Sequence, residues 1–305
     1  MFSLIVCSVH PPYLLQLQAS VAETIGVTHE WLIWDNRKEN RGLATVYNDL
    51  AAQAQHPYII FLHEDLIFNT QGWGQILLTH FEQHPGTALI GVAGGRYKSN
   101  LCSGWYTGLP GYDYIYVTHR DKGQEYHLHR PDVWPQAFMP AAVLDGLFMA
   151  CRKKAWEASP FDTQLLKGFH FYDIDFSLRL AQQSGVMITN TINLIHLTKG
   201  GDYSEVWAQE ALKYHHARKN ILPFAVGEYN RAKADKAVAL YWLDWLKNFS
   251  IKPATRWRWV RAQGFLQQPG LWYAVAKFLL YKPLRLKAVH EQIKNRRTVW
   301  NRKSR

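Results

Sequence analysis

The sequence predicts an α/β protein: a Rossmann-like, mostly parallel sheet with flanking helices, followed by a helical, basic C-terminal appendage. In the first 95 of 305 residues, short apolar runs alternate with segments whose apolar residues recur at helical spacing, which is typical of parallel strands covered by helices. The C-terminal part differs in charge, because residues 251–305 hold 14 Lys or Arg and one acid, against 21 and 23 in the first 250. We therefore expect a nearly neutral globular domain over residues 1–220 and a basic, Trp-rich helical region over residues 221–305.

The composition excludes several classes of protein. With 48% hydrophobic and 19% charged residues, the chain has ample material for a core and is not a disordered protein. Cys7, Cys102 and Cys151 are far apart and form no Cys-x-x-Cys pair, which argues against a disulfide framework and a structural zinc site and favours a reducing compartment. The apolar run at residues 2–9 is too short for a secretory leader, and no stretch of about 18 apolar residues predicts a membrane span.

The elements of the sheet follow in order along the chain. We expect strands at residues 2–9, 30–34, 58–62 and 88–93, with helices at 13–25, 43–54 and 69–83, the last beginning at the capping pair Asn69-Thr70. Residues 94–135 lose this pattern in Gly, Pro, Tyr, His and Trp, which predicts a functional loop or lid. Order returns at residues 144–150, followed by a helix at 172–183, a strand at 186–189 and a helix at 204–219.

Acidic residues follow two of the predicted strands. His63-Glu64-Asp65 comes directly after the apolar run at 58–62, so it should lie at the carboxyl edge of the sheet, where open α/β sheets bind ligands. Carboxylates there suit a hard divalent cation such as Mg²⁺; a strand that simply ends in solvated acids is an equally good interpretation of the tripeptide alone. Asp35-Asn36 follows the run at 31–34 in the same way and could accept hydrogen bonds from a base or ribose, or form an Asx turn.

Three later segments carry further polar groups. Asp145-Gly146 precedes an apolar run, and its glycine permits a turn or the close approach of a ligand. Asp173 and Asp175 open a predicted helix two residues apart, so they do not share a helical face: one could be a general base and the other a helix-terminal or structural acid, while helix capping explains either one alone. His196 leaves an apolar run and becomes a candidate ligand if it converges with Asp65 on one cation.

In this order and spacing, the five segments resemble a family 2 glycosyltransferase of the GT-A fold, especially the branch that is similar to the streptomycin-biosynthesis glycosyltransferase domain. The resemblance covers roughly residues 1–220. It implies that Asp35 and Asn36 bind the donor nucleoside and that Asp145 and Gly146 border the sugar and acceptor pocket. It also implies that Asp173 stands in the place of the inverting base.

The resemblance further implies a cation, Mg²⁺ or Mn²⁺, held by Asp65 and His196. His63-Glu64-Asp65 is not a strict Asp-x-Asp, so Asp65 is the matching metal acid, with His63, Glu64 and Asp175 as supporting residues. The implied enzyme is a metal-dependent, inverting transferase of the hexosyl type. It would move a sugar from a nucleotide-sugar donor to a hydroxyl of a glycan or lipid-linked acceptor in surface polysaccharide or lipopolysaccharide biosynthesis.

Aromatic residues mark the two remaining regions. Those of the 94–135 segment could stack on sugars or form a local core under a long loop: Tyr97, Trp105, Tyr106, Tyr112 and Trp134. In the C-terminal region, Arg256-Trp257-Arg258-Trp259, the cations from Lys277 to Lys287 and Arg296-Arg297 predict contact with an anionic membrane, hence a peripheral protein at the cytoplasmic face. A helical appendage whose Trp residues pack on the body is the plainer interpretation, and nucleic acid is a less favoured partner.

Two other functions remain open from the sequence. The first is a non-catalytic nucleotide-sugar or glycan-binding module of the same fold. The second is a membrane or nucleic-acid adaptor that acts through the basic tail.

Overall fold

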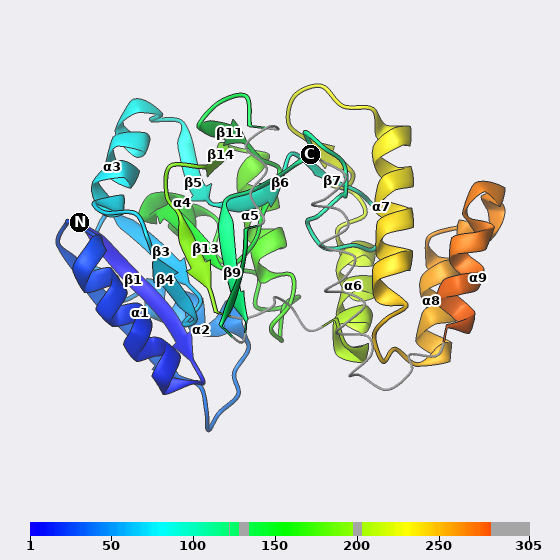
Figure 1. Ribbon diagram of the computed structural model, residues 1–305, viewed down its shortest axis with the longest axis horizontal. Coiled ribbons are helices and arrows are strands. Elements are labelled where there is room, and N and C mark those ends of the chain that lie inside the picture. The colour runs from blue at the N-terminus through cyan, green and yellow to red at the C-terminus, as the bar shows by residue number, and fades with distance from the viewer. Residues whose placement is uncertain (122, 128–133, 198–202, 282–305) are drawn as a thin grey trace.

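The computed structural model describes residues 1–121, 123–127, 134–197 and 203–281 (Figure 1). The strands are β1 Phe2–Ser8, β2 His29–Asp35, β3 Tyr58–Leu62, β4 Leu66–Phe68, β5 Thr87–Gly91, β6 Ala93–Gly95, β7 Tyr97–Lys98, β8 Asp113–Ile115, β9 Val117–Asp121, β10 Gln124–His127, β11 Phe138–Pro140, β12 Val143–Leu144, β13 Phe148–Arg152, β14 Gly185–Thr189, β15 Leu194–His196 and β16 Phe224–Ala225. The α-helices are α1 Pro11–Thr24, α2 Leu43–Ala51, α3 Trp73–Gln83, α4 Lys153–Ala158, α5 Tyr172–Ala181, α6 Glu205–Ala217, α7 Arg231–Leu246, α8 Pro253–Ala262 and α9 Trp272–Leu280.

The central sheet has seven strands in the order β11-β14-β5-β13-β3-β1-β2. Strands β2, β1, β3, β5 and β14 run in one direction, while β13 and β11 run antiparallel to their neighbours. The expected α/β fold with a mostly parallel sheet and flanking helices is therefore confirmed. The insertion of antiparallel β13 between β3 and β5 is the feature that the apolar pattern at 144–150 did not specify.

Alternate residues of the strands point to opposite faces, and each face is covered by its own helices. On one side, Leu4 and Val6 of β1 pack with Leu17 of α1 and with Trp73 and Leu77 of α3. On the other side, Ile5 and the alternate residues of β3 and β13 pack with α2, α5 and α6: Ile59, Phe61, Met149, Cys151, Tyr47, Phe176 and Ala208. The period-two pattern of the sequence thus builds the two halves of the core.

Helix α3 begins four residues later than the capping signal predicts. Gly72, with φ of +66°, precedes its first residue, Trp73. The side chain of Asn69 instead donates to Asn193 Oδ1 (2.9 Å), and Thr70 Oγ1 accepts from the backbone N–H of Asn193 (2.8 Å). The pair is used to bind a distant segment, so the prediction of a cap there was wrong.

The segment expected to be a loop or lid over 94–135 contains strands β6 to β10 among its described residues. β6 pairs with β8 and β12, β9 pairs with β10 and β15, and β7 pairs with β16 beyond helix α6. Its Gly and Pro residues punctuate short strands. The described residues of this segment therefore build small sheets beside the central one, which the prediction of a loop or lid did not include.

Helix α7 joins the C-terminal region to the body (Figure 1). Trp242 is buried, stacks on Trp207 of α6 with ring centroids 5.1 Å apart, and donates from Nε1 to the carbonyl of Tyr106 (2.9 Å). Asp235 accepts hydrogen bonds from the hydroxyls of Tyr97 (2.6 Å) and Ser99. The apolar face of α7 around Trp242 and Leu246 is thus directed at the body, and one core cluster extends across residue 220.

Candidate functional site at the carboxyl edge of the sheet

The register of the sheet brings three of the predicted segments to one edge. Ser8 is aligned with Asp35, and Val6 with Leu62, so β1, β2 and β3 end together. Strand β13 runs the other way, and its first residue, Phe148, is aligned with Leu62. The residues just before β13 therefore lie beside those just after β3. The His63 N–H donates to the carbonyl of Leu147 (3.0 Å), which fixes this junction.

A second pairing carries a residue from far along the chain to the same place. Strand β15 runs antiparallel to β4, with His196 aligned to Leu66, and the Leu197 N–H donates to the carbonyl of Asp65 (2.9 Å). As a result, His196 Nε2 lies 3.1 Å from Asp65 Oδ2, and both side chains are buried. The expected convergence of His196 with Asp65 is present in the structure.

His63, Asp65 and His196 form a cluster that could hold a metal ion. Each offers one ligand atom, and these atoms lie within 4.8 Å of one another. Burial alone would lower the pKa of His196, but the hydrogen bond and charge of Asp65, with the charge of Asp145, raise that pKa above its ordinary value. Burial lowers the pKa of His63, against the opposing charge of Asp65. Negative charge is thus concentrated where a cation would lie.

Asp173 lies against the backbone of Gly146. Its Oδ2 accepts the Gly146 N–H at 3.0 Å, and Tyr172 OH, next to it, lies 2.9 Å from His63 Nε2. A Cβ at position 146 would lie 2.2 Å from the Tyr172 hydroxyl and 2.9 Å from Asp173 Cβ, so only glycine permits this approach. Position 146 therefore requires glycine for steric reasons, and the close contact links the Asp145-Gly146 segment to the start of α5.

The surroundings of Asp173 favour the protonated, uncharged form of its carboxyl group. Burial, followed by the negative charge of Asp145, raises the pKa of Asp173 to about 7. A carboxylate with such a pKa can accept a proton at physiological pH more readily than an ordinary surface acid.

Phe171, which precedes α5, has φ of +66°, an unusual angle for a bulky residue, and its buried ring stacks on Tyr214 at 4.9 Å.

The donor-side candidates occupy different environments. Asp35 is exposed at the end of β2, which lies two strands, or about 10 Å, from β3. The hydrogen bonds that Asp35 accepts from Arg37 lower the pKa of its carboxyl group to about 2. The Asn36 side chain is buried and makes two 2.8 Å hydrogen bonds with the backbone of Arg41, so its amide closes the loop after β2. Asp145 Oδ2 accepts from Trp105 Nε1 at 2.8 Å.

Two of the supporting acids have partners within the protein. Glu64 accepts hydrogen bonds from Ser8 Oγ (2.6 Å) and from the backbone N–H groups of Val9 and His10, at the start of α1. Asp175 is fully buried and is held by two arginines, Arg179 and Arg218, whose Nε atoms donate at 2.8 and 2.6 Å. Both carboxylates therefore stabilise the chain around the site.

Three residues at or beside this edge were not among the site residues predicted from the sequence. Tyr172 contacts His63, Trp105 contacts Asp145, and the ring of His119 on β9 lies 5.1 Å from that of His196, as β9 pairs with β15. Trp105 was among the loop aromatics for which sugar stacking and a local core remained open. Its neighbours Tyr97, Tyr106 and Trp134 pack within the chain, on Tyr112, Tyr241 and Tyr114 respectively. No local sequence pattern signals contacts of this kind.

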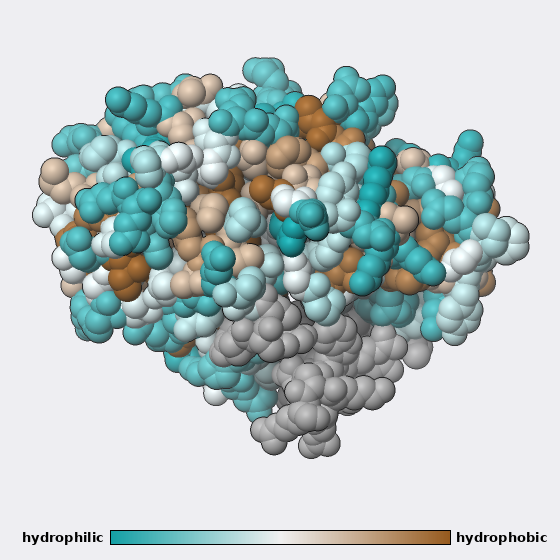
Figure 2. Space-filling view, turned by 90° about the horizontal axis from the view of Figure 1, so that it is seen from above, coloured by the Kyte–Doolittle hydropathy of each residue, from teal (hydrophilic) through white to brown (hydrophobic). Residues whose placement is uncertain are grey.

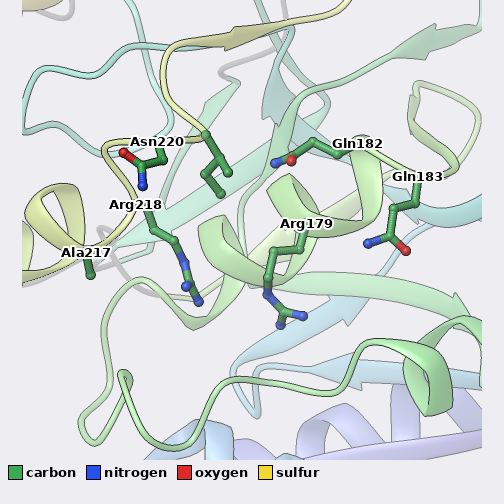
Figure 3. Close-up of a pocket in the computed structure, with 7 residues that line it drawn as sticks. Arg179, Gln182, Gln183, Ala217, Arg218 and Asn220 are labelled. Carbon is green, nitrogen blue, oxygen red and sulfur yellow. The ribbon is translucent and has the colours of Figure 1, made fainter.

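A surface pocket of about 320 Å³ lies on another side of α5 (Figure 3). Arg179 and Arg218 extend into the same space beside Gln182, Gln183 and Asn220. Their guanidinium groups are engaged with Asp175 and, for Arg218, with Asp162 as well. The pocket is therefore balanced in charge, and it shares no lining residue with the cluster of His63, Asp65 and His196.

The fold and the edge site together define a GT-A type of α/β protein. Residues 16–217, about two thirds of the chain, match the family described as "Glycosyltransferase like family". The chain belongs to this glycosyltransferase-like family, as the sequence resemblance predicted. No curated protein sequence matches the chain.

Solved structures with the same fold include S. aureus TarS. Its 1–349 portion in complex with UDP-GlcNAc is 12% identical with a TM-score of 0.52, over 96% of this chain and 91% of that chain. Without a stated ligand, the same portion has a TM-score of 0.52 and 10% identity over the same shares. The mannosyltransferase PcManGT from Pyrobaculum calidifontis, in complex with GDP-Man and Mn²⁺, is 12% identical with a TM-score of 0.47, over 92% of this chain and 81% of that chain. The TarS structures support the GT-A fold.

Proposed function

We propose that this protein is a metal-dependent, inverting glycosyltransferase that moves a sugar from a nucleotide-sugar donor to a hydroxyl of a glycan or lipid-linked acceptor. One observation carries the proposal: Asp173, a half-buried acid whose pKa is raised to about 7, lies at the same sheet edge as the cluster of His63, Asp65 and His196. A base and a cation site side by side are what displacement of a nucleoside diphosphate by a hydroxyl requires.

Asp173 would act on the acceptor. Its carboxylate takes the proton of the attacking hydroxyl as the new glycosidic bond forms and the bond to the donor phosphate breaks. Because attack comes from the side opposite the leaving nucleotide, the sugar inverts with one base and no covalent enzyme intermediate. Gly146 holds Asp173 through its N–H, and Trp105 donates to Asp145, which would border the sugar and acceptor.

The donor would extend along the edge from β2 to β3. Asp35 is exposed for contact with the nucleoside, and Asn36 shapes the neighbouring loop through Arg41. The residues at the cation cluster fit a divalent ion: about 2.1 Å bonds place neighbouring octahedral ligands about 3 Å apart, and His196 Nε2 and Asp65 Oδ2 are separated by 3.1 Å. Such a cation would offset the charge of the departing diphosphate.

A donor-binding panel tests this function. Thermal unfolding would be followed with UDP-, GDP-, dTDP- and CMP-sugars, each with Mn²⁺, Mg²⁺ or EDTA, because a ligand of the native state raises the apparent stability. We expect one nucleotide class to raise the Tm, and only when metal is present. At a ligand concentration a hundredfold above Kd, the free energy of unfolding should increase by about 2.7 kcal/mol. Asp65→Ala should abolish that shift, whereas Asp49→Ala, an exposed acid on α2, should retain it. If no donor shifts the folded protein, the transferase proposal fails.

We further propose that the catalytic domain spans residues 1–220 and that residues 221–305 attach it to the cytoplasmic face of an anionic membrane, where a lipid-linked acceptor would be found. In the described part of the chain, no helix combines the length and apolar character needed to cross a bilayer. The face shown in Figure 2 is largely hydrophilic, with apolar groups in small separate patches. Within the described residues, we place the membrane-contact surface on α8, α9 and the turn between them.

The exposed residues of α8 and α9 support such a surface. Trp257, Trp272, Tyr273 and Leu280 are between 46% and 79% exposed, and Lys277 lies over the Tyr273 ring at 4.4 Å. The structure divides the basic motif at 256–259 into a buried half and an exposed half. Arg256 and Trp259 are buried, with Arg256 donating to carbonyls that include those of Phe249 and Phe278, so only the other half of the motif faces solvent. Residues 282–305, which hold Lys287, Arg296 and Arg297, lie outside the described residues.

Vesicle co-sedimentation tests this attachment. The protein should bind vesicles that contain phosphatidylglycerol and not those of phosphatidylcholine alone, with affinity falling as salt rises, because each basic residue near the surface contributes about 1 kcal/mol. The double substitution W272A and Y273A should weaken binding by about tenfold or more. A matched change on the body, Leu15→Ala on α1, should not. Equal binding to both kinds of vesicle, or binding to RNA alone, would contradict the proposal.

A further inference from the structure

We propose that Trp242 of helix α7 is a positioning residue for the sugar side of the site, which it supports through the loop at residues 104–108. The inference rests on the proposed function and gives the C-terminal region a second role beyond attachment. Three features of the structure support it: the contacts that bind this loop to α7, the contact that joins the loop to Asp145, and the place of Asp145 beside the proposed base.

Helix α7 holds the loop through the indole of Trp242. The indole Nε1 donates to the carbonyl of Tyr106 at 2.9 Å, and a Cβ at position 104 would lie 2.7 Å from the ring carbons Cζ2 and Cη2 of Trp242. Glycine at 104 therefore permits an approach that a larger residue would prevent. Trp242 is 3% exposed and also stacks on Trp207 of α6, with the two rings 8° from parallel, so the indole has little freedom to move.

Further contacts fix the same part of the chain to α7. The ring of Tyr106 packs on Tyr241, with centroids 4.9 Å apart. About two turns earlier on the helix, Asp235 accepts hydrogen bonds from the hydroxyls of Tyr97 and Ser99. Because these attachments lie at both ends of the segment, the loop is fixed in place along the helix and not at a single point.

The loop makes a direct contact with the site through Trp105. Its indole Nε1 donates to Asp145 Oδ2 at 2.8 Å, and its ring packs against both core clusters of the body. Its chain neighbours on either side, Gly104 and Tyr106, are the residues that contact Trp242. A hydrogen bond to a carboxylate depends steeply on distance and angle, so a displaced loop would weaken the bond to Asp145.

Asp145 lies beside the proposed base. Its Oδ1 accepts the Leu147 N–H at 3.0 Å, its own N–H donates to the carbonyl of Ala93, and the next residue, Gly146, donates to Asp173. The hydrogen bond from Trp105 to Oδ2 completes this set and fixes the rotation of the carboxylate. In the proposed function that carboxylate borders the sugar, so the support from α7 should matter for the sugar part of the donor.

A spectroscopic test measures the contact without any ligand. The full chain, which has 13 Trp, would be labelled with ¹⁵N at Trp, and the Trp105 indole resonance would be assigned by its absence in Trp105→Phe. We expect this resonance to move by more than its linewidth in Trp242→Phe. It should also move in Gly104→Ala, which removes no aromatic ring. Gly86→Ala, where an added Cβ has no neighbour within 4 Å, should leave it unchanged.

Donor binding tests the consequence for the site. For the nucleotide sugar that raises the Tm, calorimetric Kd values with Mn²⁺ would be compared with those of the same nucleotide without the sugar. Trp105→Phe, Trp242→Phe and Gly104→Ala should each weaken binding of the nucleotide sugar by about tenfold and leave that of the nucleotide within about threefold. Because Trp242 acts through Trp105, the double variant of these two should also lose about tenfold, and not about a hundredfold.

A matched variant separates positioning from stability. Leu246→Ala truncates a fully buried residue of the same helix, so it should lower the Tm at least as much as Trp242→Phe while leaving the Trp105 resonance and both Kd values unchanged. If Trp242→Phe does not fold, Gly104→Ala provides both measurements.

Other outcomes overturn the inference. A Trp105 resonance that stays in place in both Trp242→Phe and Gly104→Ala would show that α7 does not fix this indole. Equal losses for the nucleotide sugar and for the nucleotide, or a hundredfold loss in the double variant, would show that Trp242 does not act through Trp105. Failure of the proposed function gives a different result, in which the resonance moves as expected but no donor binds the wild type.

Discussion

Replacing Asp173 by Asn should lower kcat by about 10³-fold while leaving the Kd for the nucleotide-sugar donor within about threefold of wild type. Asparagine has nearly the same shape and retains an oxygen that can accept the Gly146 N–H, but it cannot take a proton. Turnover would be measured with the donor and acceptor that the binding panel identifies. Normal turnover would remove Asp173 as the base, and loss of donor binding would indicate a damaged site.

The pH dependence provides a second measure of the same group. Because burial and Asp145 raise the pKa of Asp173 to about 7, kcat/KM should rise with pH through about 7 and level off above it, as the carboxylate becomes the dominant form. An ordinary surface acid would give its rise near pH 4. A profile that is flat between pH 5 and 8 would show that another group accepts the proton.

Stability should change in the opposite direction to activity. The pKa of Asp173 in the folded protein lies above its unfolded value, so the favourable contribution of the protonated form is full below pH 4 and is lost as pH rises through about 7. At pH 8 the wild type must hold a half-buried carboxylate, and Asp173→Asn does not. The variant should therefore have the higher Tm at pH 8, and the two should converge near pH 4. A variant that is inactive and more stable cannot owe its inactivity to unfolding.

Replacing Asp175 by Asn should destabilise the protein by about 3 kcal/mol, because it leaves two arginines without their buried counter-ion. Asp175 is fully buried, and Arg179 and Arg218, each 20% exposed, donate to both of its oxygens. Denaturant unfolding would measure the change. Asp49→Asn, which removes an exposed partner of Arg41, should cost less than about 1 kcal/mol.

The Asp175 variant also separates a structural role from a role in the site. If Asp175 only holds α5 and α6 together, kcat and the donor Kd measured well below the Tm should remain within about threefold of wild type. A similar loss of stability in Asp175→Asn and Asp49→Asn would contradict the buried ion pair. A loss of turnover without a loss of stability would place Asp175 among the residues that act on the substrate.

Local patterns predicted the order of elements in the sheet domain. Strands β1, β2, β3 and β5, with the helices between them, follow from apolar periodicity, because burial of one face is decided within each segment. The strand-end rule also brought Asp35 and Asp65 to one edge, since the carboxyl ends of parallel strands meet there. The same reasoning failed for 94–135, where the short strands β6 to β10 are stabilised by pairing with partners far away in the sequence.

By itself, the sequence determined the fold class, the family and most of the polar residues proposed for the site, because these depend on spacing and local burial. Only the tertiary structure decided which of those residues meet. The pairing of β15 with β4 joins His196 to Asp65, and antiparallel β13 brings Gly146 against Asp173. Tertiary contacts also assigned Glu64 to the start of α1. A carboxylate's partner is set by distances across the fold, and these do not appear in the order of residues along the chain.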